Sequence, residues 1–423
     1  MSFWYKLFTY LFYILSPLYF FFRKLKKKEH PIRYKEKLSK IKIKKNTGFL
    51  TWFHVASVGE AMSVLPLIEK LKESEKVKTI LITSITVSSA TVLEKKFLQD
   101  EKVIHQFLPL DVPVLVNKFL NHWSPDLCIF IDSEIWPNLI FGIKNRNIPL
   151  LLVNGRITKK TFQRWNYLKK FSKKVFEKFD LCLTSNRETE TYLQKLGAKN
   201  IKNYGNIKFA NTKTISKDGL SSDFLFKIKN RTIWCAASTH PTEEIFCVKT
   251  HMLIKKYYKN ILTIIIPRHI NRIQKITEEI SKENLKVCHY KNFKEINSDT
   301  DILLIDTYGE SSKFYQISKC VFLGKSLNES LSHDSGQNPI EASRMGCKIF
   351  HGPYITNFSE IYKYLKSLGV THEISSSDEL SKSLVDELKL DKTLDKDIVK
   401  KIENYGIDTL NNVFREIKIY IDK

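Results

Sequence analysis

The chain has 423 residues, of which 43% are hydrophobic and 27% are charged. This length predicts two domains rather than one, and the apolar content excludes an intrinsically disordered protein. The net charge of +24 favours a polyanionic partner, such as anionic lipid, a phosphorylated substrate or nucleic acid, although a lysine-rich genome composition explains it equally well.

Residues 1–28 have the pattern of a membrane anchor. Leu7 to Phe22 is a run without a charge, and Arg23 to Lys28 reads RKLKKK. A basic cluster on the carboxyl side of an apolar run is opposite to a secretory signal, and the positive-inside bias predicts that the rest of the chain is cytoplasmic. Because Ser16-Pro17 interrupts the run, the sequence does not decide whether this segment spans the bilayer or lies in one leaflet. The alternative to a membrane anchor is a buried core helix.

A charged connector, about residues 29–46, leads into a half in which short apolar runs alternate with amphipathic stretches. The stretches at residues 61–72 and 188–196 are typical of helices, and Gly197 is typical of a carboxyl-terminal cap. Strands that alternate with helices predict βαβ units and a parallel sheet. The predicted strands are residues 49–55, 79–85, 103–108, 127–131, 150–153 and 181–184.

A polar, turn-rich segment then predicts a linker, after which the alternation restarts. Ligands of such folds bind at the carboxyl ends of the strands, so we expect two doubly wound α/β domains that face a cleft holding the active site. The later strands are predicted at residues 233–236, 262–266, 302–306, 321–323 and 348–350. The predicted divisions are an anchor (1–28), a first domain (29–212), the linker (213–230), a second domain (231–400) and a carboxyl-terminal helix (401–423).

The seven cysteines are scattered, without a C-x-x-C pair, and most lie in or beside apolar runs. An odd number without clustering argues against a disulfide framework and against a zinc site. We therefore expect a reducing compartment, small core roles for the cysteines, and no bound metal.

Candidate catalytic residues follow two predicted strands of the first domain, and another lies just before the linker. Glu60, in WFHVASVGE, lies where a glycine turn leads into a helix, and is either a general base or a residue that complements the helix dipole. Asp132 and Glu134 follow the apolar run DLCIFI, where carboxylates are costly unless they are used. A capping role at the helix that Trp136-Pro137 starts explains one of them, less easily both. Lys208, in YGNIKF, either reaches across the cleft or is one more exposed lysine.

Strand-end loops of the second domain are suited to a phosphate. In AASTHPTEE, Pro241 is expected at the first helical position with Glu243 and Glu244 in the first turn, so that free N–H groups face an anion. The run IIIPRH ends a strand with Arg268 and His269, two cations poised for an anion.

Two further loops predict a nucleotide site. DTYGESSKFY ends a strand in a glycine turn, and the loop at residues 324–346 feeds a helix that Glu341 opens. Amides at the start of that helix suit a phosphate, and the acid suits ribose hydroxyls. Neither a Walker loop nor a G-x-G-x-x-G after the first strand occurs in the sequence, which argues against a kinase or a dehydrogenase.

Taken together, the motifs resemble the 3-deoxy-D-manno-octulosonic acid (Kdo) transferases of lipopolysaccharide assembly. The segments that carry the resemblance span nearly the whole chain in the family's order: the apolar amino end, WFHVASVGE, SEIWPNL, NGRIT, GNIKF, AASTHPTEE, IIPRH, YGE and GQNPIEA. The resemblance implies a GT-B glycosyltransferase without a cofactor or required metal. It also implies a place at the cytoplasmic side of a bacterial inner membrane.

The resemblance assigns roles to individual residues. It implies that the first domain receives lipid A precursor, that the second binds CMP-Kdo, and that Glu60 is the general base of an inverting transfer. Lys208 would neutralise the negative charge that builds on the leaving CMP, and Glu134 would have a stabilising or positioning role. The nucleotide contacts implied are Pro267, Arg268, Tyr308, Gly309, Glu310, Ser335, Gly336, Gln337, Asn338 and Glu341.

The chain departs from the family pattern at two points. It reads SGQN, from Ser335 to Asn338, where the family reads G-G-H-N, and D-S-E, with Asp132, where the family reads E-x-E. Ser335 supplies the same N–H if its φ permits, and Gln337 can donate a hydrogen bond but cannot take a charge.

Two other functions are weighed against this one. A GT-B lipid glycosyltransferase that uses a UDP-sugar is the nearest alternative. A membrane-tethered nucleic-acid-binding protein would account for the charge, but most aromatic residues fall in the anchor and at core-like positions rather than between basic residues, so we expect no nucleic-acid partner.

Overall fold

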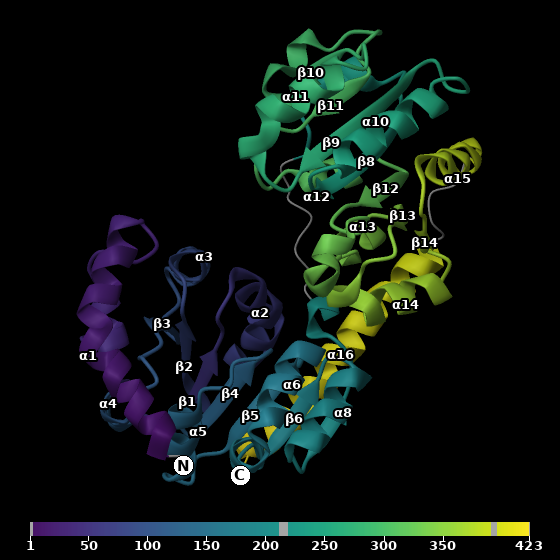
Figure 1. Ribbon diagram of the computed structural model, residues 1–423. Helices are drawn as coiled ribbons and strands as arrows, with labels where there is room; N and C mark the ends of the chain where they lie inside the picture. Colours follow the sequence, from purple (N-terminus) through teal and green to yellow (C-terminus); the bar gives the residue numbers. More distant parts are fainter. Residues whose placement is uncertain (1–2, 211–218, 391–395, 423) are drawn as a thin grey trace. The chain divides into compact units, whose positions relative to one another are not determined.

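The computed structural model describes residues 3–210, 219–390 and 396–422. They form two compact units, one made of residues 1–212 with 405–423 and the other of residues 213–404. Each unit contains a seven-stranded sheet in which all neighbouring strands run parallel (Figure 1). The two doubly wound α/β folds expected from the sequence are therefore present.

The strand order of the N-terminal unit is β3-β2-β1-β4-β5-β6-β7. The order reverses between β1 and β4, and in open α/β sheets the crevice at such a reversal is where ligands bind. The strands are β1 (Phe49–His54), β2 (Val77–Ser84), β3 (Val103–Phe107), β4 (Leu127–Ile131), β5 (Leu150–Gly155), β6 (Leu181–Thr184) and β7 (Ile201–Asn203).

Every side chain of β4 is buried, because helices cover both faces of a parallel sheet. This is why the continuous apolar run predicted the strand with its observed ends, and the other predicted strands of this unit lie within two residues of the observed ones. The sequence analysis missed β7, a strand of three residues at the sheet edge whose side chains are half-buried or exposed.

Hydroxyl or amide side chains cap the starts of several helices in this unit. Ser57, Thr86, Thr158 and Asn186 each accept a hydrogen bond from the backbone N–H three residues later. Gly197 has φ +106° after α8, which confirms the predicted cap. The helices are α2 (Val58–Lys72), α3 (Val87–Phe97), α4 (Pro113–Trp123), α5 (Pro137–Lys144), α6 (Lys159–Tyr167), α7 (Lys169–Phe176) and α8 (Arg187–Leu196).

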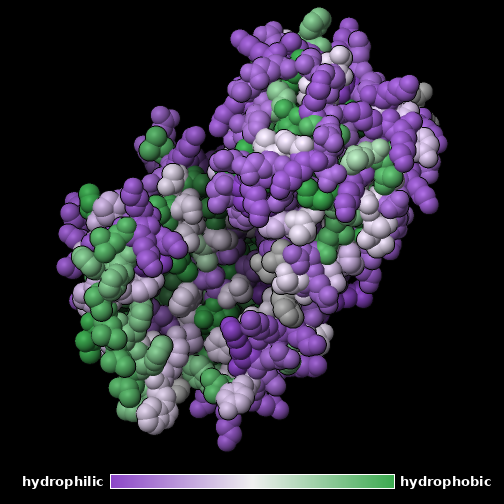
Figure 2. Space-filling model, turned by 45° about the horizontal axis from the view of Figure 1, so that its top comes forward, coloured by the Kyte–Doolittle hydropathy of each residue, from purple (hydrophilic) through white to green (hydrophobic). Residues whose placement is uncertain are grey.

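The amino-terminal apolar run forms one continuous helix, α1 (Phe3–Leu25). The predicted interruption at Ser16-Pro17 is wrong, because the helix continues through Pro17. Its inner face buries Thr9, Ser16 and Phe20, whereas most of its other large apolar side chains are exposed, so α1 is not a core helix. Figure 2 shows hydrophobic side chains gathered where α1 lies on the N-terminal unit. Among the described residues, no helix combines the length and apolarity needed to cross a membrane.

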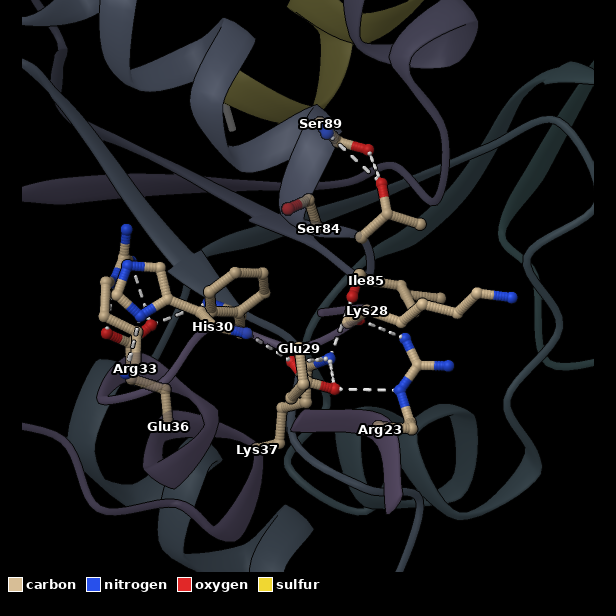
Figure 3. A network of polar contacts seen from close by, with 12 residues as sticks. Arg23, Lys28, Glu29, His30, Arg33, Glu36, Lys37, Ser84, Ile85 and Ser89 are labelled. Carbon is tan, nitrogen blue, oxygen red and sulfur yellow. Dashed lines mark hydrogen bonds and ion pairs between the residues drawn. The ribbon is translucent and has the colours of Figure 1, made fainter. Parts of the chain in front are cut away.

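The charged connector after α1 is held to the unit by a polar network that Figure 3 shows from close by. Lys37, in a short 3-10 helix (Arg33–Leu38), donates to both oxygens of Glu29 over 2.8 and 2.9 Å and to the carbonyl of Ile85. Arg23, at the end of α1, donates to the same carboxylate over 3.1 Å. Two cations on one buried carboxylate fix the end of α1 against the unit.

The strand order of the C-terminal unit is β10-β11-β9-β8-β12-β13-β14, with its reversal between β8 and β12. The two edge strands β10 and β14 are absent from the sequence analysis because each has three residues, of which only one is buried. The strands are β8 (Thr232–Thr239), β9 (Ile261–Pro267), β10 (Val287–His289), β11 (Ile302–Leu304), β12 (Cys320–Leu323), β13 (Lys348–His351) and β14 (Thr371–Glu373).

The predicted linker at residues 213–230 lies partly outside the described residues, but Ser222–Ile228 form a helix, α9, whose Phe224 is buried. Pro241 was expected to start a helix, yet α10 begins two residues later, after Thr242 at φ +82°. The helices are α9, α10 (Glu243–Ile254), α11 (Ile273–Ser281), α12 (Ser311–Tyr315), α13 (Ile340–Arg344), α14 (Ser359–Ser367) and α15 (Ser377–Lys389).

The carboxyl-terminal helix, α16 (Lys396–Asp422), contributes its second half to the N-terminal unit. There Val413, Ile417 and Ile421 are buried in the same core as β1 and α2. Glu416 accepts from Lys202 over 2.8 Å and from the hydroxyl of Tyr204 over 2.7 Å. The last residues of the chain therefore stabilise the first domain.

Candidate active site

Glu60 lies in the first turn of α2, directly after the carboxyl end of β1. Its backbone N–H donates to Ser57 Oγ over 3.3 Å, while its carboxylate accepts from the Ser57 hydroxyl over 2.8 Å and from the Ala56 N–H over 2.7 Å. This arrangement is a variant of the capping box, in which the glutamate accepts the N–H of the residue before the N-cap. The local sequence S-V-G-E thus places the carboxylate at the helix start, at the edge of the sheet where β1 ends.

The surroundings of Glu60 make its carboxyl group a weak acid. Burial raises the pKa of Glu60 to about 7, and the negative charges of Asp132 and Glu134 act in the same direction, against the hydrogen bonds from Ala56 and Ser57. A group that only complemented the helix dipole would have a lowered pKa. Glu60 therefore caps the helix and, in addition, has the near-neutral pKa that suits a general base.

Asp132 is the first residue after β4 and is buried in a left-handed conformation, with φ +59°. Its backbone N–H donates to the carbonyl of Val153 over 3.2 Å, and its own carbonyl accepts from the N–H of Arg156 over 3.1 Å. Burial raises the pKa of Asp132 above its ordinary value, although Lys208 and Arg156 oppose that rise. The aspartate at the D-S-E position is thus part of the turn that ends β4.

Glu134 is held by two donors on one oxygen, Oε2. The fully buried His54, the last residue of β1, lies 3.2 Å away through Nε2, and Trp136 donates through Nε1 over 2.8 Å. Burial acts to raise the pKa of Glu134, but the bond and charge of His54 and the bond from Trp136 outweigh it, so the pKa is lowered. Glu134 does not cap α5, whose N-cap is Trp136.

Lys208 lies in a short 3-10 helix (Ile207–Ala210) after β7. Its ammonium is 3.6 Å from Asp132 Oδ2. Asn154 and Asn206 hold the segment, because their side-chain oxygens accept from the N–H groups of Ile207 and Lys208 over 3.0 Å each. The sequence analysis expected Lys208 either to reach across the cleft or to be one more exposed lysine. The structure places its charge beside a carboxylate of the N-terminal unit, that of Asp132.

These side chains gather at one edge of the sheet. Glu60 follows β1, Asp132 and Glu134 follow β4, and these two neighbouring strands flank the reversal of the strand order (Figure 1). The electrostatic coupling of Glu60 to both other acids indicates that the three carboxylates share one site. We refer to His54, Glu60, Asp132, Glu134 and Lys208 as the acidic site.

In the C-terminal unit, Pro267 ends β9 and is buried, whereas the Arg268 side chain is exposed. The Arg268 N–H donates to the carbonyl of Thr239 over 3.0 Å, which joins the carboxyl ends of β9 and β8. The predicted cation is therefore held by its backbone, and its guanidinium projects from the strand end that the sequence indicated.

Tyr308, Gly309 and Glu310 form the turn that follows β11. Gly309 has φ +84°, a conformation that favours glycine, and Tyr308 is 68% exposed. Glu310 lies 2.9 Å from Lys313 on α12. An exposed aromatic ring on a glycine turn can stack on a planar ligand.

The segment from Ser335 to Asn338 is fixed by its own hydrogen bonds. Ser335 is buried at φ −96°, an ordinary extended conformation, and its hydroxyl lies 2.6 Å from that of Thr356. Gly336 has φ +84° and donates to the carbonyl of Lys325 over 2.7 Å. Serine is thus accommodated where the family has glycine, whereas the next position needs glycine because a Cβ there would lie 2.9 Å from the backbone of Ile355.

The remaining predicted nucleotide contacts lie at the start of α13. Asn338 accepts the N–H of Ile340 over 3.1 Å, and the carbonyl of Gln337 accepts from the Tyr362 hydroxyl over 3.0 Å. Glu341, in the first turn, is half-buried. The Asn338 side chain and the Gln337 carbonyl therefore help to shape the loop.

Glu243 is a structural residue whose role the sequence analysis missed. Its carboxylate is fully buried and accepts four backbone N–H groups, those of His240, Lys325, Ser326 and Leu327, over 2.7 to 3.1 Å. The first turn of α10 was expected to leave its N–H groups to a phosphate. Its acid binds the loop after β12, across the reversal between β8 and β12, and the phosphate at this turn stays a prediction.

His54 is the second residue that sequence reasoning missed. Its only sequence signal is a histidine inside an apolar strand, which is equally typical of a core residue. Its partner, Glu134, is 80 positions away in the chain, so no local pattern could pair them.

Solved structures with a similar fold are UDP-N-acetylglucosamine 2-epimerases. One matches with a TM-score of 0.58 and 14% identity, over 89% of this chain and 96% of that chain. The enzyme from Neisseria meningitidis bound to UDP-GlcNAc matches with a TM-score of 0.56 and 11% identity, over 88% of this chain and 99% of that chain. At these identities the likeness shows the fold alone, the two-domain GT-B type.

The sequence comparisons identify the family. The family model described as 3-deoxy-D-manno-octulosonic-acid transferase (kdotransferase) matches residues 32–211. The 3-deoxy-D-manno-octulosonic acid transferase of Rickettsia bellii is 32% identical over 98% of this chain and 96% of its own length. That of Haemophilus influenzae is 30% identical over 79% of this chain and 78% of its own length. With the acidic site at the expected strand ends, this chain belongs to the Kdo transferases, a family of glycosyltransferases.

Proposed function

We propose that this enzyme transfers Kdo from CMP-Kdo to lipid A precursor, a tetraacyldisaccharide bisphosphate, with inversion and without a metal, in lipopolysaccharide core biosynthesis. The observation that carries the proposal is Glu60, a carboxylate with a pKa of about 7 at the strand-order reversal of the N-terminal unit. We infer the identities of the donor and the acceptor from the resemblance to the family.

In the proposed reaction Glu60 accepts the proton of an acceptor hydroxyl. The freed oxygen attacks the anomeric carbon of Kdo, the bond from that carbon to the phosphate oxygen breaks, and CMP leaves with the electron pair. A base with a pKa near the working pH is effective because a substantial fraction is ionised and the ionised form is still strong enough to take the proton. The lowered pKa of Glu134 keeps this carboxylate ionised, so we assign it a stabilising or positioning role rather than that of the base.

The negative charge that develops on the CMP phosphate needs a cation. Arg268 carries an exposed guanidinium at the end of β9, and Lys208 carries an ammonium beside Asp132. We assign the donor to the loops around Arg268, Tyr308 to Glu310 and Ser335 to Glu341. Charge-assisted hydrogen bonds of this kind to phosphate are among the stronger ones in proteins.

We further propose that α1 lies on the cytoplasmic face of a bacterial inner membrane, in one leaflet. Its exposed apolar face and the basic run from Arg23 to Lys28 are the two features that bind a helix to an anionic surface. A helix in this position would bring the acidic site to a lipid acceptor.

The transfer itself is tested with the full-length chain and purified tetraacyldisaccharide bisphosphate. Mass spectrometry after incubation with CMP-Kdo should show the acceptor plus Kdo, also in the presence of a chelator, and no product with UDP-sugars. A product formed only from a UDP-sugar would replace this proposal with a GT-B lipid glycosyltransferase of other donor specificity.

Replacing the proposed base tests the mechanism. Glu60→Gln keeps the size and most of the capping contacts but cannot take a proton, so kcat should fall by roughly 10²–10⁴-fold while calorimetry still detects CMP binding. Glu69→Gln, on the same helix and paired only with surface lysines among the described contacts, is the matched control and should keep normal turnover. Normal turnover of Glu60→Gln would rule out its role as the base.

A further inference from the structure

A pocket of about 350 Å³ lies between α1 and the body of the N-terminal unit. Phe8, Phe12 and Phe20 of α1 form one wall, and Leu110 and Val112, from the segment after β3, form part of the other. Packed protein interiors leave few voids larger than a water molecule, and an apolar cavity of about 150 Å³ already accommodates a benzene ring. This space is therefore large enough for an extended hydrocarbon ligand.

The charged side chains at the pocket, Asp111 and Lys37, are bonded to the protein itself. The carboxylate of Asp111 accepts from the Tyr5 hydroxyl over 2.7 Å and from the backbone N–H groups of Asn138 and Leu139 over 3.0 and 2.8 Å. Lys37 donates to Glu29 and to a backbone carbonyl, as Figure 3 shows. The charges in the wall are thus already compensated, and the remaining surface favours an apolar ligand over a sugar or a nucleotide.

The pocket touches the acidic site at one end. Trp136 is one of its lining residues, and Nε1 of the same side chain donates to Glu134 over 2.8 Å. On another side, Phe8 lines the pocket and is nevertheless 66% exposed, so the pocket borders the exposed apolar face of α1. An apolar chain that enters beside α1 can therefore extend towards the residues that hold Glu134.

We propose that this pocket holds one acyl chain of the lipid acceptor, so that α1 is a wall of the acceptor site as well as a membrane contact. The inference rests on the proposed function, because the occupant is a chain of the substrate whose hydroxyl is activated at Glu60. An acyl chain in the pocket would fix the distance between the membrane surface and the acidic site.

The pocket is tested with water-soluble acceptors that carry hexanoyl, octanoyl or decanoyl chains, used below their critical micelle concentrations. In the unmodified enzyme KM should fall with chain length, by up to about fourfold for each methylene that leaves water. Leu110→Trp fills the pocket and should remove this dependence, so that KM for the decanoyl acceptor becomes as high as KM for the hexanoyl acceptor. Leu11→Trp adds the same bulk on the exposed face of α1 and should leave the dependence intact.

A photoactivatable dodecanoic acid provides a readout that needs no turnover. With the full-length chain in phosphatidylcholine vesicles, labelling should concentrate on the pocket residues and should be reduced in Leu110→Trp. Absence of transfer to every acceptor would overturn the proposed function, whereas labelling confined to the outer face of α1 would overturn the pocket. An unchanged chain-length dependence in Leu110→Trp, with transfer intact, would also overturn the pocket alone.

Discussion

The two glutamates of the acidic site share an edge of the sheet but differ in acidity. Burial raises the pKa of Glu60 to about 7, whereas two hydrogen-bond donors lower the pKa of Glu134. Environments that separate the pKa values of neighbouring acids commonly distinguish a base from a residue that stays ionised. The contrast supports our proposal that Glu60 rather than Glu134 is the base.

The pH dependence of the reaction follows from the raised pKa of Glu60. Only the ionised carboxylate can take a proton, so kcat/KM should rise with pH through about 7 and fall by about tenfold for each unit below pH 6. The profile is measured with a saturating donor and a soluble acceptor. A rate that stays constant between pH 5 and pH 8 would contradict the assignment of the base.

Removing the neighbouring charge should move that profile. The charge of Glu134 raises the pKa of Glu60, so Glu134→Gln should shift the rise of kcat/KM to lower pH. Because Glu134 also accepts two hydrogen bonds, kcat should fall by about tenfold or more. The Glu69→Gln variant should keep the unmodified profile, and a Glu134→Gln profile that moved to higher pH would show that its charge does not act on Glu60.

At the scale of elements, one side chain of the C-terminal unit, Glu243, connects the helix that follows β8 to the loop that follows β12. Glu243, at the start of α10, binds the N–H groups of the loop after β12. In the same loop Gly324 has no room for a side chain, because a Cβ would lie 2.6 Å from the Glu243 carboxylate. The loop that the sequence analysis assigned to the nucleotide is thus preorganised by Glu243, at the start of α10.

Glu243→Gln should destabilise this unit. The amide offers one acceptor oxygen and turns an NH₂ group towards N–H donors, so at least one buried N–H loses its partner, at a cost of about 1–3 kcal/mol. The melting transition that CMP stabilises should shift down by several degrees, and CMP affinity should weaken. Glu279→Gln, a partly exposed residue near Lys275 on α11, should change the melting temperature little. Equal effects of the two variants would contradict the role of Glu243.

At the scale of the whole molecule, we expect the net positive charge and the apolar face of α1 to contribute together to membrane binding. The net charge of +24 acts over the distance of the Debye length, about 10 Å at 0.1 M salt. The apolar face of α1 acts only on contact and is insensitive to salt. The charge should therefore attract the protein to an anionic membrane, and α1 should retain it there.

Deleting residues 1–28 separates the two contributions. The residues of α1 are absent from the two main hydrophobic clusters around the N-terminal sheet, so the shortened chain should fold. In vesicle flotation it should bind phosphatidylglycerol at low salt, release at high salt, and fail to bind phosphatidylcholine. The full-length chain should bind both lipids. If the shortened chain binds phosphatidylcholine as well as the full-length chain does, α1 is not the membrane contact.

Features that depend on neighbouring residues could be predicted from the sequence. The apolar run DLCIFI predicted β4 because a strand covered on both faces needs apolar side chains at every position. The local order S-V-G-E likewise placed Glu60 at the junction of β1 and α2, since capping is a contact between residues three apart.

Features that depend on distant residues were decided only by the tertiary structure. His54 meets Glu134, and Glu243 meets the loop at Lys325, because parallel strands bring distant segments to one sheet edge. Both the raised pKa of Glu60 and the pocket beneath α1 arise from burial by several segments at once. A sequence read locally indicates which residues reach the strand ends, whereas burial and long-range pairing determine what each of them does there.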